Sequence, residues 1–393
     1  MCVNIGFPST AFGVYQPYIA ALIGDAPASL VVSVRALVSF ACMALVNGFY
    51  RRISCRGGVF LATVFTVVGF VVFSFSHSTA GFMVGSALCG AGYGLGGMVG
   101  MTLLIGRWFK TRVGTAVGIA SMGSGIAGIV LPVIATSIIE SAGLSWAFRA
   151  EAAIGAIVAV LLIVLLRDDP ADIGLEPYAK LPKKAQKEKR VIGSATTVGG
   201  AKRWLLLLGM VFMGSTAVSG IAYLGILMTS CGFSAYFAAT MLSIYSVALA
   251  VSKLVGGMLF DALGTLKASL LFFGIYIVGI VLCTLCFTGV PAVAVAAAAL
   301  FGFGASLGTV GLSVWGIDLS APDGRPALVK SMQMGYALGS FIFGLIPGPL
   351  ATLCNGSYAV TYGIFIVLAA AELFIVVYVY KSHHGQKTGE AGQ

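Results

Sequence analysis

The feature that most constrains this chain is a series of twelve apolar segments that recurs from one end of the sequence to the other. A run of roughly 20 apolar residues is long enough to cross a lipid bilayer as an α-helix. The runs are continuous rather than alternating, which favours helices over the strands of a membrane barrel. Only 9% of the residues are charged, whereas about a quarter are charged in soluble proteins. We therefore predict an all-α membrane protein with twelve transmembrane helices, at 3–24, 28–47, 59–77, 81–105, 112–139, 146–166, 204–228, 234–259, 268–288, 291–314, 327–352 and 357–380.

The positive charges follow the order of these segments. With the N-terminus inside, 20 of the 23 lysines and arginines fall in the inner loops and the C-terminal tail, and the outer loops contain none. Such an asymmetry sets the orientation of membrane helices. The net charge of +10 then reflects topology, and no nucleic-acid partner is expected. We predict a multi-pass protein of the cell (inner or plasma) membrane, embedded in the lipid bilayer, with both termini in the cytoplasm.

One hydrophilic stretch, 167–203, divides the apolar segments into two sets of six. Its lysines and its glycine-, serine- and threonine-rich end are typical of a cytoplasmic linker. We predict an N-terminal six-helix bundle at 1–166, a C-terminal bundle at 204–380 and a cytoplasmic tail at 381–393. Helix one begins almost at Met1, so a short cytoplasmic lead before it is expected.

The two sets of helices resemble each other. Gly48 opens GFYRRISCRG after the second segment, and Gly257 opens GMLFDALGTLK after the eighth. Glycine-rich faces end at Pro132 in the fifth segment and at Pro347 in the eleventh. Matching features at matching places indicate a duplicated six-helix unit, as in transporters that are built from repeats.

Twelve helices, a division into six and six, and the loop motif after helix eight together resemble the major facilitator superfamily over nearly the whole chain. Two segments resemble its monocarboxylate porter and oxalate/formate antiporter branch: RWFKTRVGTAVGIASMGSGIAG at 107–128 and RDDPADIGLEPY at 167–178. The resemblance implies two pseudo-symmetric six-helix bundles. It also implies secondary active transport by alternating access, and we expect a functional monomer.

Lys253 lies inside the apolar eighth segment. A lysine at the centre of a membrane helix costs roughly 2.5–3.5 kcal/mol on insertion scales, and Lys253 precedes the loop residue Asp261 by about 12 Å of helix. A buried cation at this depth requires a counter-charge or a water-filled cavity. One interpretation is that an anionic substrate supplies it, since the resemblance places an arginine of that branch at the same spacing. The alternative is a structural pair with a membrane carboxylate such as Glu372.

Two differences between this chain and that branch narrow the range of expected substrates. Its oxalate transporters carry a second cation in a Tyr-Ala-Lys-Gly pattern in helix eleven, where this chain has Leu338 after Tyr336 and Ala337. A single cation suits a monoanion. The monocarboxylate porters carry a proton-coupling aspartate where this chain has Leu249. This chain therefore lacks the carboxylate that proton symport by that route requires.

Several other residues are candidates for the site. Tyr336, Tyr15, Gln16 and Tyr223 could give a carboxylate hydrogen-bond partners, although ordinary packing is the alternative for each. Arg35, in helix two, could recruit or gate an anion on the outer side. The alternatives are that its charged end extends to the membrane surface or pairs locally. Glu372 could be silent, pair with a cation or bind a proton.

The loop motif has a different predicted role. Asp261 can stabilise the N-terminus of the next helix or pair with Lys267, while Gly257 and Gly264 allow close packing and a tight turn. The resemblance implies that this loop latches the cytoplasmic side. A basic gate between helices four and five is implied in the same way, with topology as the alternative explanation for its residues, Arg107, Lys110 and Arg112.

No pattern points to an enzyme, a cofactor or a metal. Gly92-x-Gly94-x-x-Gly97 fits a dinucleotide fingerprint, but it lies in an apolar helix with no preceding strand. We therefore predict a secondary active transporter of a small organic anion, monocarboxylate-like, working by antiport or cotransport. The alternatives are a porter for another metabolite or drug, and a transporter-like sensor without flux.

Overall fold

The computed structural model describes residues 1–109, 113–178, 197–321 and 325–390. Nearly all of these residues are helical, and within the described ranges the only β feature is an isolated bridge between Phe109 and Tyr178. Ten helices in those ranges are long and apolar enough to cross a membrane. The prediction of an all-α membrane protein is therefore confirmed.

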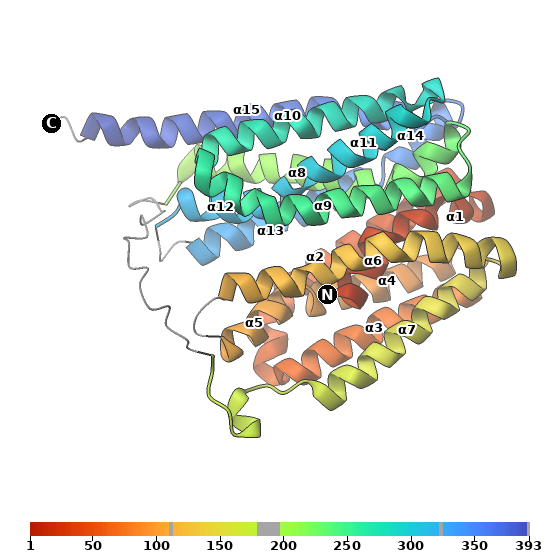
Figure 1. Cartoon of the computed structure of the whole chain (residues 1–393), viewed down its shortest axis with the longest axis horizontal. Helices are drawn as coiled ribbons and strands as arrows, with labels where there is room; N and C mark the ends of the chain where they lie inside the picture. The colour runs from red at the N-terminus through yellow and green to blue at the C-terminus, as the bar shows by residue number, and fades with distance from the viewer. Residues whose placement is uncertain (110–112, 179–196, 322–324, 391–393) are drawn as a thin grey trace.

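The helices form two groups that lie side by side, with the ends of the linker at one edge of the molecule (Figure 1). The N-terminal group contains η1 (Cys2–Ala11), η2 (Phe12–Val14), α1 (Gln16–Ile23), α2 (Asp25–Arg52), α3 (Cys55–Phe75), α4 (Thr79–Gly96), α5 (Met98–Trp108), α6 (Val113–Ala142), α7 (Leu144–Leu165) and the short η3 (Pro170–Ile173). The C-terminal group contains α8 (Gly200–Ser230), α9 (Ala235–Leu263), α10 (Thr265–Thr284), η4 (Leu285–Thr288), α11 (Pro291–Gly304), η5 (Ala305–Gly308), α12 (Val310–Asp318), α13 (Arg325–Gly344), α14 (Pro347–Leu353) and α15 (Ala359–Glu390).

Four of the twelve predicted helices are broken, among them the tenth, which is divided into α11, η5 and α12, and the eleventh, which is divided into α13 and α14. The first consists of a π-helical stretch, a 3-10 turn and α1, and it contains Pro8, which has no N–H to donate. The fourth is interrupted at Gly97, between α4 and α5. The Asn4 amide of η1 reaches the break in the fourth helix, donating to Thr63 Oγ1 at 3.2 Å and to the Gly96 carbonyl at 3.4 Å. Polar groups inside the membrane thus satisfy one another.

Glycines bring α8 and α13 unusually close together. A Cβ added at Gly214 of α8 would collide with the backbone carbonyl of Tyr336, and one added at Gly339 of α13 would collide with the carbonyl of Val211. The Ser215 hydroxyl also donates to the Gly339 carbonyl, at 3.2 Å. Small residues at such a crossing allow the close backbone contact that stabilises membrane helix pairs.

Replacing Gly214 with leucine is expected to destabilise the protein strongly, because backbone cannot move aside as a flexible side chain can. Overpacking typically costs roughly 1–3 kcal/mol and can cost more. Thermal unfolding in detergent should show a melting temperature several degrees lower and a smaller monodisperse fraction. Gly274→Leu, on α10 where an added Cβ meets open space, is the matched control and should behave like wild type.

Both ends of the linker pack against the helical groups. At its start, Asp168 accepts a hydrogen bond from the Arg56 N–H at the beginning of α3, at 2.7 Å, and the Tyr178 N–H donates to the Trp108 carbonyl at 2.8 Å. At its end, the Val198 N–H donates to the Leu319 carbonyl at 2.9 Å. The predicted limits of the two bundles stay a prediction, but the linker is anchored on each side.

Candidate functional site

A cavity with a volume of about 110 Å³ lies between the two groups of helices. Its walls come from η1, α2 and α4 on one side and from α8, η5, α12 and α13 on the other. The described lining residues are Ser9, Arg35, Ala36, Ser39, Met43, Tyr93, Gly94, Val218, Gly308, Thr309, Leu312, Ser313, Gln333, Tyr336, Ala337 and Ser340. Because both groups contribute, relative motion of the groups would open or close this space.

Arg35 is the cation of this cavity. Its side chain is only 4% exposed, and its Nη1 has no hydrogen-bond partner among the described residues. The guanidinium carbon lies 5.9 Å from the centre of the Phe12 ring, which provides a cation–π contact but no counter-charge. Ser39, one turn further along α2, also has a buried hydroxyl without a partner in the described structure. A buried charge and a buried hydroxyl that both lack partners favour an anion as the missing group.

The opposite wall is a stripe along one face of α13. Gln333, Tyr336, Ala337 and Ser340 recur at helical spacing, so that they line the cavity together. The Tyr336 ring packs over Gly308 of η5, where an added Cβ would lie 2.7 Å from the ring. This wall offers amide and hydroxyl hydrogen bonds without a second charge. The cavity as a whole can hold a solute with one anionic end and a polar or apolar body.

Lys253 is not among the described residues that line this cavity. It is half-buried on α9, about one turn beyond Ala250, whose Cβ lies 3.4 Å from the position of a Cβ on Gly125 of α6. Lys253 therefore lies on the face of α9 that is turned toward the N-terminal group. The one ion pair in the described ranges joins Arg107 to Asp169, so Lys253 is not paired with Glu372 there. Its role as substrate anchor stays a prediction.

Tyr15 and Gln16 lie away from the described cavity lining. The Tyr15 hydroxyl donates to Glu151 Oε1 at 2.7 Å, and its ring packs on Phe148 at 4.5 Å between centres. Gln16 is fully buried, and neither its amide nitrogen nor its amide oxygen has a partner in the described structure. The predicted ligand set of six residues is therefore brought together only in part, by Arg35 and Tyr336.

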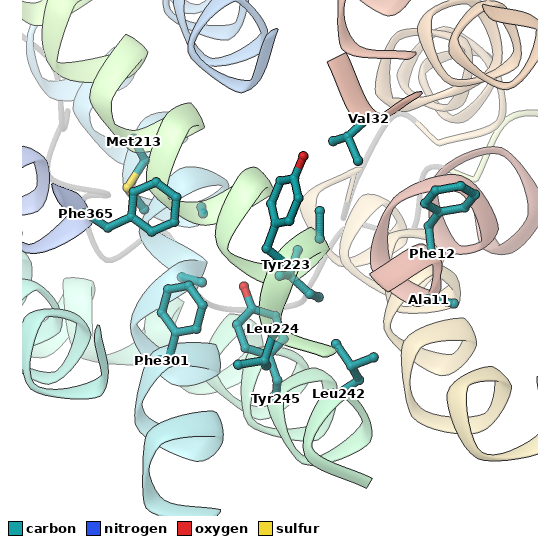
Figure 2. Close-up of a cluster of buried hydrophobic side chains, with 14 of the residues drawn as sticks. Ala11, Phe12, Val32, Met213, Tyr223, Leu224, Leu242, Tyr245, Phe301 and Phe365 are labelled. Atoms are coloured by element: carbon teal, nitrogen blue, oxygen red, sulfur yellow. The ribbon is translucent and has the colours of Figure 1, made fainter. Parts of the chain in front are cut away.

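Tyr223 lies at the end of the molecule opposite the linker, where the two groups touch. Its hydroxyl donates to the Gly344 carbonyl at 2.8 Å and is directed toward Val32 of α2 (Figure 2). Nearby, the Gly348 N–H donates to Ser29 Oγ and the Tyr358 hydroxyl to Asp25, both at 2.7 Å. We call this set of contacts, from Asp25, Ser29, Tyr223, Gly344, Gly348 and Tyr358, the closed end.

On both walls, the residues that line the cavity lie next to those that form the closed end. Along α2, Asp25 and Ser29 belong to the closed end, whereas Arg35 and Ser39 line the cavity. Along the eleventh membrane segment, Ser340 lines the cavity and Gly344 belongs to the closed end. The structure thus corresponds to a state that is shut on the side opposite the linker.

The structure describes some of the residues of the loop motif and of the basic gate. Gly264 has a φ of +79°, a left-handed conformation suited to glycine, and separates α9 from α10. Lys267 is exposed on α10, and Gly257 lies inside α9 with open space around it. Asp261 is in the last turn of α9, with its side chain outside the described set.

In the gate, the Arg107 side chain pairs with Asp169 at 3.2 Å, with both partners more than two-fifths exposed. Lys110 and Arg112 lie outside the described residues.

Glu372 is fully buried in α15. Its Cγ lies 3.7 Å from the position of a Cβ on Gly209 of α8, and neither carboxyl oxygen has a partner among the described residues. Its role as a proton site stays a prediction. A second buried carboxyl, Glu151, is 3% exposed.

Sequence reasoning missed Ser39, Tyr93 and Gln333 as lining residues. Arg35 and Ser39 are four residues apart, and Gln333 and Tyr336 are three apart, within otherwise apolar helices. Polar residues at these spacings share one helix face. This spacing was the sequence signal that could have identified Ser39 and Gln333 as neighbours of Arg35 and Tyr336 in the site.

Comparison with known proteins identifies related sequences. Residues 2–238 match the family model described as Major Facilitator Superfamily. The "Fujikurins efflux protein" of Gibberella fujikuroi is 30% identical over 109 residues, which cover 28% of this chain and 23% of that protein. The "MFS-type transporter pytF" of Aspergillus terreus is 28% identical over 163 residues, covering 41% and 50%. The chain thus spans about half or less of the length of these two relatives.

Solved structures with the same fold include the nucleoside transporter NupG, with a TM-score of 0.76, 13% identity, and coverage of 97% of this chain and 98% of that chain. A D-xylose–proton symporter has a TM-score of 0.72 and 14% identity, with coverage of 95% and 94%. At this level of identity the likeness concerns the fold alone, and the twelve predicted helices agree with it.

Proposed function

The chain belongs to the Major Facilitator Superfamily, and we propose on that basis that it moves a small organic anion across the membrane by alternating access. The family consists of membrane transporters, so the chain is not an enzyme. The monocarboxylate and oxalate/formate branch is part of the proposal, because the relatives named above are a fungal efflux protein and a fungal MFS-type transporter whose names do not place them in that branch. The membrane that holds the protein and the cytoplasmic location of its termini remain predictions.

One observation carries the proposal: Arg35 is buried in a cavity between the two groups, with a guanidinium nitrogen that has no partner in the described structure. A carboxylate can accept two parallel hydrogen bonds from a guanidinium group, which a lysine cannot offer. Ser39 and Tyr336 lie on the same lining and can donate further hydrogen bonds. We therefore assign the charge anchor to Arg35 in this conformation, with Lys253 as the competing candidate.

The size and charge of the cavity support a small monoanion. Its volume of about 110 Å³ is below the roughly 300–1,000 Å³ of pockets that enclose drug-sized ligands. A dianion would bring a second negative charge, for which the described lining provides no second cation. The expected order is therefore monocarboxylates before dicarboxylates, with neutral solutes last.

A second candidate function is export of a larger metabolite, as the name of the fujikurin efflux relative suggests for that protein. Part of the lining is apolar and is formed by Met43, Val218 and Leu312. This part could hold the hydrocarbon portion of a larger solute, which favours the export function. A membrane sensor without flux is the third reading, and measurable transport excludes it.

Counterflow in proteoliposomes tests the proposal. Vesicles preloaded with one unlabelled acid would receive labelled formate, acetate, lactate, pyruvate or oxalate, with glucose as the neutral control. We expect saturable, preload-dependent uptake of at least one monocarboxylate and about tenfold less uptake of oxalate. If reconstituted, monodisperse protein moves none of these anions but moves a larger organic acid, the export function is correct. If it moves nothing, transport of either class is wrong.

A further inference from the structure

Arg149 lies near the start of α7, at the end of the N-terminal group opposite the linker (Figure 1). Its guanidinium carbon is 4.9 Å from the centre of the Trp146 ring and 5.2 Å from the centre of the Phe75 ring. Two aromatic rings hold the charge in place but do not neutralise it. The one ion pair in the described ranges lies at the linker end. Arg149 is therefore a positioned cation without an anionic partner in the described part of the chain.

A hollow with a volume of about 380 Å³, which we call the Arg149 pocket, lies beside this cation. Its polar lining consists of Arg149, His77, Ser76 and Ser145, and Trp146 forms part of its apolar wall. The guanidinium, imidazole and hydroxyl groups can all donate hydrogen bonds, and no carboxylate is among the described lining residues. A cation surrounded by hydrogen-bond donors suits an oxyanion such as a phosphate group.

The Arg149 pocket lies where membrane helices end. Phe75 is the last residue of the span Cys55–Phe75, and Leu144 is the first residue of the span Leu144–Leu165. Trp146 is 56% exposed and Phe75 is 67% exposed. Tryptophan is enriched where the hydrocarbon of a bilayer meets the lipid headgroups. The pocket is therefore expected at the depth of the headgroups, where phospholipids carry their phosphates.

A second hollow, with a volume of about 310 Å³, lies further along α7. We call it the α7 groove, and its described lining is Ala156, Ile157, Val160 and Leu161. These residues follow Arg149 by seven, eight, eleven and twelve positions, so they share its face of the helix. The groove begins about 10 Å below Arg149 at 1.5 Å per residue. One face of α7 thus carries a cation at the membrane edge and an apolar groove beneath it.

The direction of the side chains joins the two hollows. Helical side chains tilt toward the N-terminus of their helix, and α7 begins at the membrane edge, so Arg149 extends toward the headgroups. Such an extension keeps the charge of an arginine out of the hydrocarbon. Ala153 lies between Arg149 and the α7 groove on the same face, and it is small and exposed. The surface between the pocket and the groove is therefore open to a chain-like ligand.

We propose that the Arg149 pocket and the α7 groove form one binding site for an anionic phospholipid of the leaflet opposite the linker. The phosphate binds at Arg149, and an acyl chain lies along the groove. A cationic headgroup finds no partner, because no carboxylate lines the described pocket. The exposed Glu140, two residues before the lining residue Ala142, disfavours a second negative charge. Phosphatidylglycerol, with one negative charge, should therefore bind in preference to phosphatidylcholine.

The site is separate from the cavity at Arg35, since the two share no described lining residue. All of its described lining belongs to the N-terminal group, from α1, α3, α6, α7 and the turns between them. A lipid bound there would hold this group at a fixed depth in the bilayer while the other group moves. The inference does not depend on transport, and its test measures binding alone.

The fluorescence of Trp146 reports occupancy of the site, because bromine on a nearby acyl chain quenches an indole. The whole protein would be reconstituted in phosphatidylcholine vesicles that contain increasing fractions of brominated phosphatidylglycerol or brominated phosphatidylcholine. Emission from the other tryptophans is subtracted with a matched Trp146→Phe protein. We expect half-quenching at about a fivefold lower mole fraction of phosphatidylglycerol, the order by which one arginine near a membrane surface favours an anionic lipid.

Arg149→Gln should remove this preference, so that both brominated lipids quench Trp146 alike. Arg52→Gln is the matched control, since Arg52 is an exposed arginine at the linker end of α2, and it should quench like wild type. Equal quenching by the two lipids in wild-type protein, or a preference that survives in Arg149→Gln, would overturn the proposal and show that only unselective boundary lipid is present.

Two further measurements test the groove and the source of the phosphate. Ala156→Phe fills the α7 groove without changing charge and should weaken quenching by phosphatidylglycerol to the level of phosphatidylcholine. Ile154→Phe, at another exposed position of α7, should behave like wild type. Unchanged quenching in Ala156→Phe would contradict a single site. An excess of inorganic phosphate should leave quenching unchanged, whereas displacement of the lipid would show that the pocket binds free phosphate and that the lipid assignment is wrong.

Discussion

Arg35→Ala is expected to lower anion counterflow at least 100-fold at subsaturating substrate, while the purified protein keeps its size-exclusion profile. The guanidinium is the only positive charge on the described lining of the cavity, so its removal leaves a bound carboxylate without a counter-charge. Truncating one partner of a buried charge pair costs about 2–5 kcal/mol, and 100-fold corresponds to roughly 2.7 kcal/mol. The measurement is the initial rate of labelled monocarboxylate uptake into preloaded vesicles.

Two further variants make this result specific. Arg35→Lys keeps the charge but loses the paired hydrogen bonds, so we expect about a tenfold rise in KM and a smaller change in maximal rate. Lys253→Ala, at the cation outside the described lining, should retain transport within about threefold. The opposite pattern, with transport lost in Lys253→Ala and kept in Arg35→Ala, would assign the anchor to Lys253 as the sequence pattern alone suggests.

Gly348→Val is expected to reduce counterflow about 30-fold without unfolding the protein. A Cβ at Gly348 would collide with the Asp25 carbonyl and with Ser29 Oγ, so a valine cannot be accommodated while the closed end is shut. Alternating access requires that the cavity is closed on one side before it opens on the other. A carrier that cannot close this end either stays open on both sides of the membrane or stays in the state that is open at this end and shut on the linker side.

Cysteine labelling provides the second readout for Gly348→Val. The Cys354→Ser background removes the native thiol that lies just beyond α14, and a cysteine introduced at Ser39 then reports access from the closed end. We expect its labelling from that side to rise in Gly348→Val. Gly363→Val, on α15 where an added Cβ meets open space, is the matched control. Equal transport by the two variants would show that closure at Gly348 does not limit the cycle.

The membrane helices could be predicted from the sequence because their signal is local. Each apolar run reports its own burial in lipid, and the positive charges mark the turns between runs. The breaks in the first and fourth helices were not predicted. They depend on contacts between distant segments, such as the Asn4 amide that links Thr63 to Gly96, and hydropathy does not report such contacts.

The site was predicted only in part for a related reason. Lys253 attracts attention in the sequence because it interrupts an apolar run, but its depth along α9 does not say which face carries it. Arg35 has the same sequence signal, and only the packing of α2 between α4 and α13 places it on the cavity. Tyr15 was considered as a substrate ligand, whereas its partner, Glu151, lies 136 residues away in the sequence.

The contacts at the two ends of the linker indicate where the chain could be cut into two polypeptides. Arg167 and Tyr178 bind Trp108 of the N-terminal group, through the indole N–H at 3.1 Å and the backbone at 2.8 Å. Thr197 Oγ1 accepts from the Ala321 N–H of the C-terminal group at 3.1 Å. A gene split between these positions would therefore encode two polypeptides that each retain their own capping contacts. Segment 167–178 packs with the N-terminal group, whereas residues 197 and 198 pack with the C-terminal group, so a break between them would separate none of these contacts.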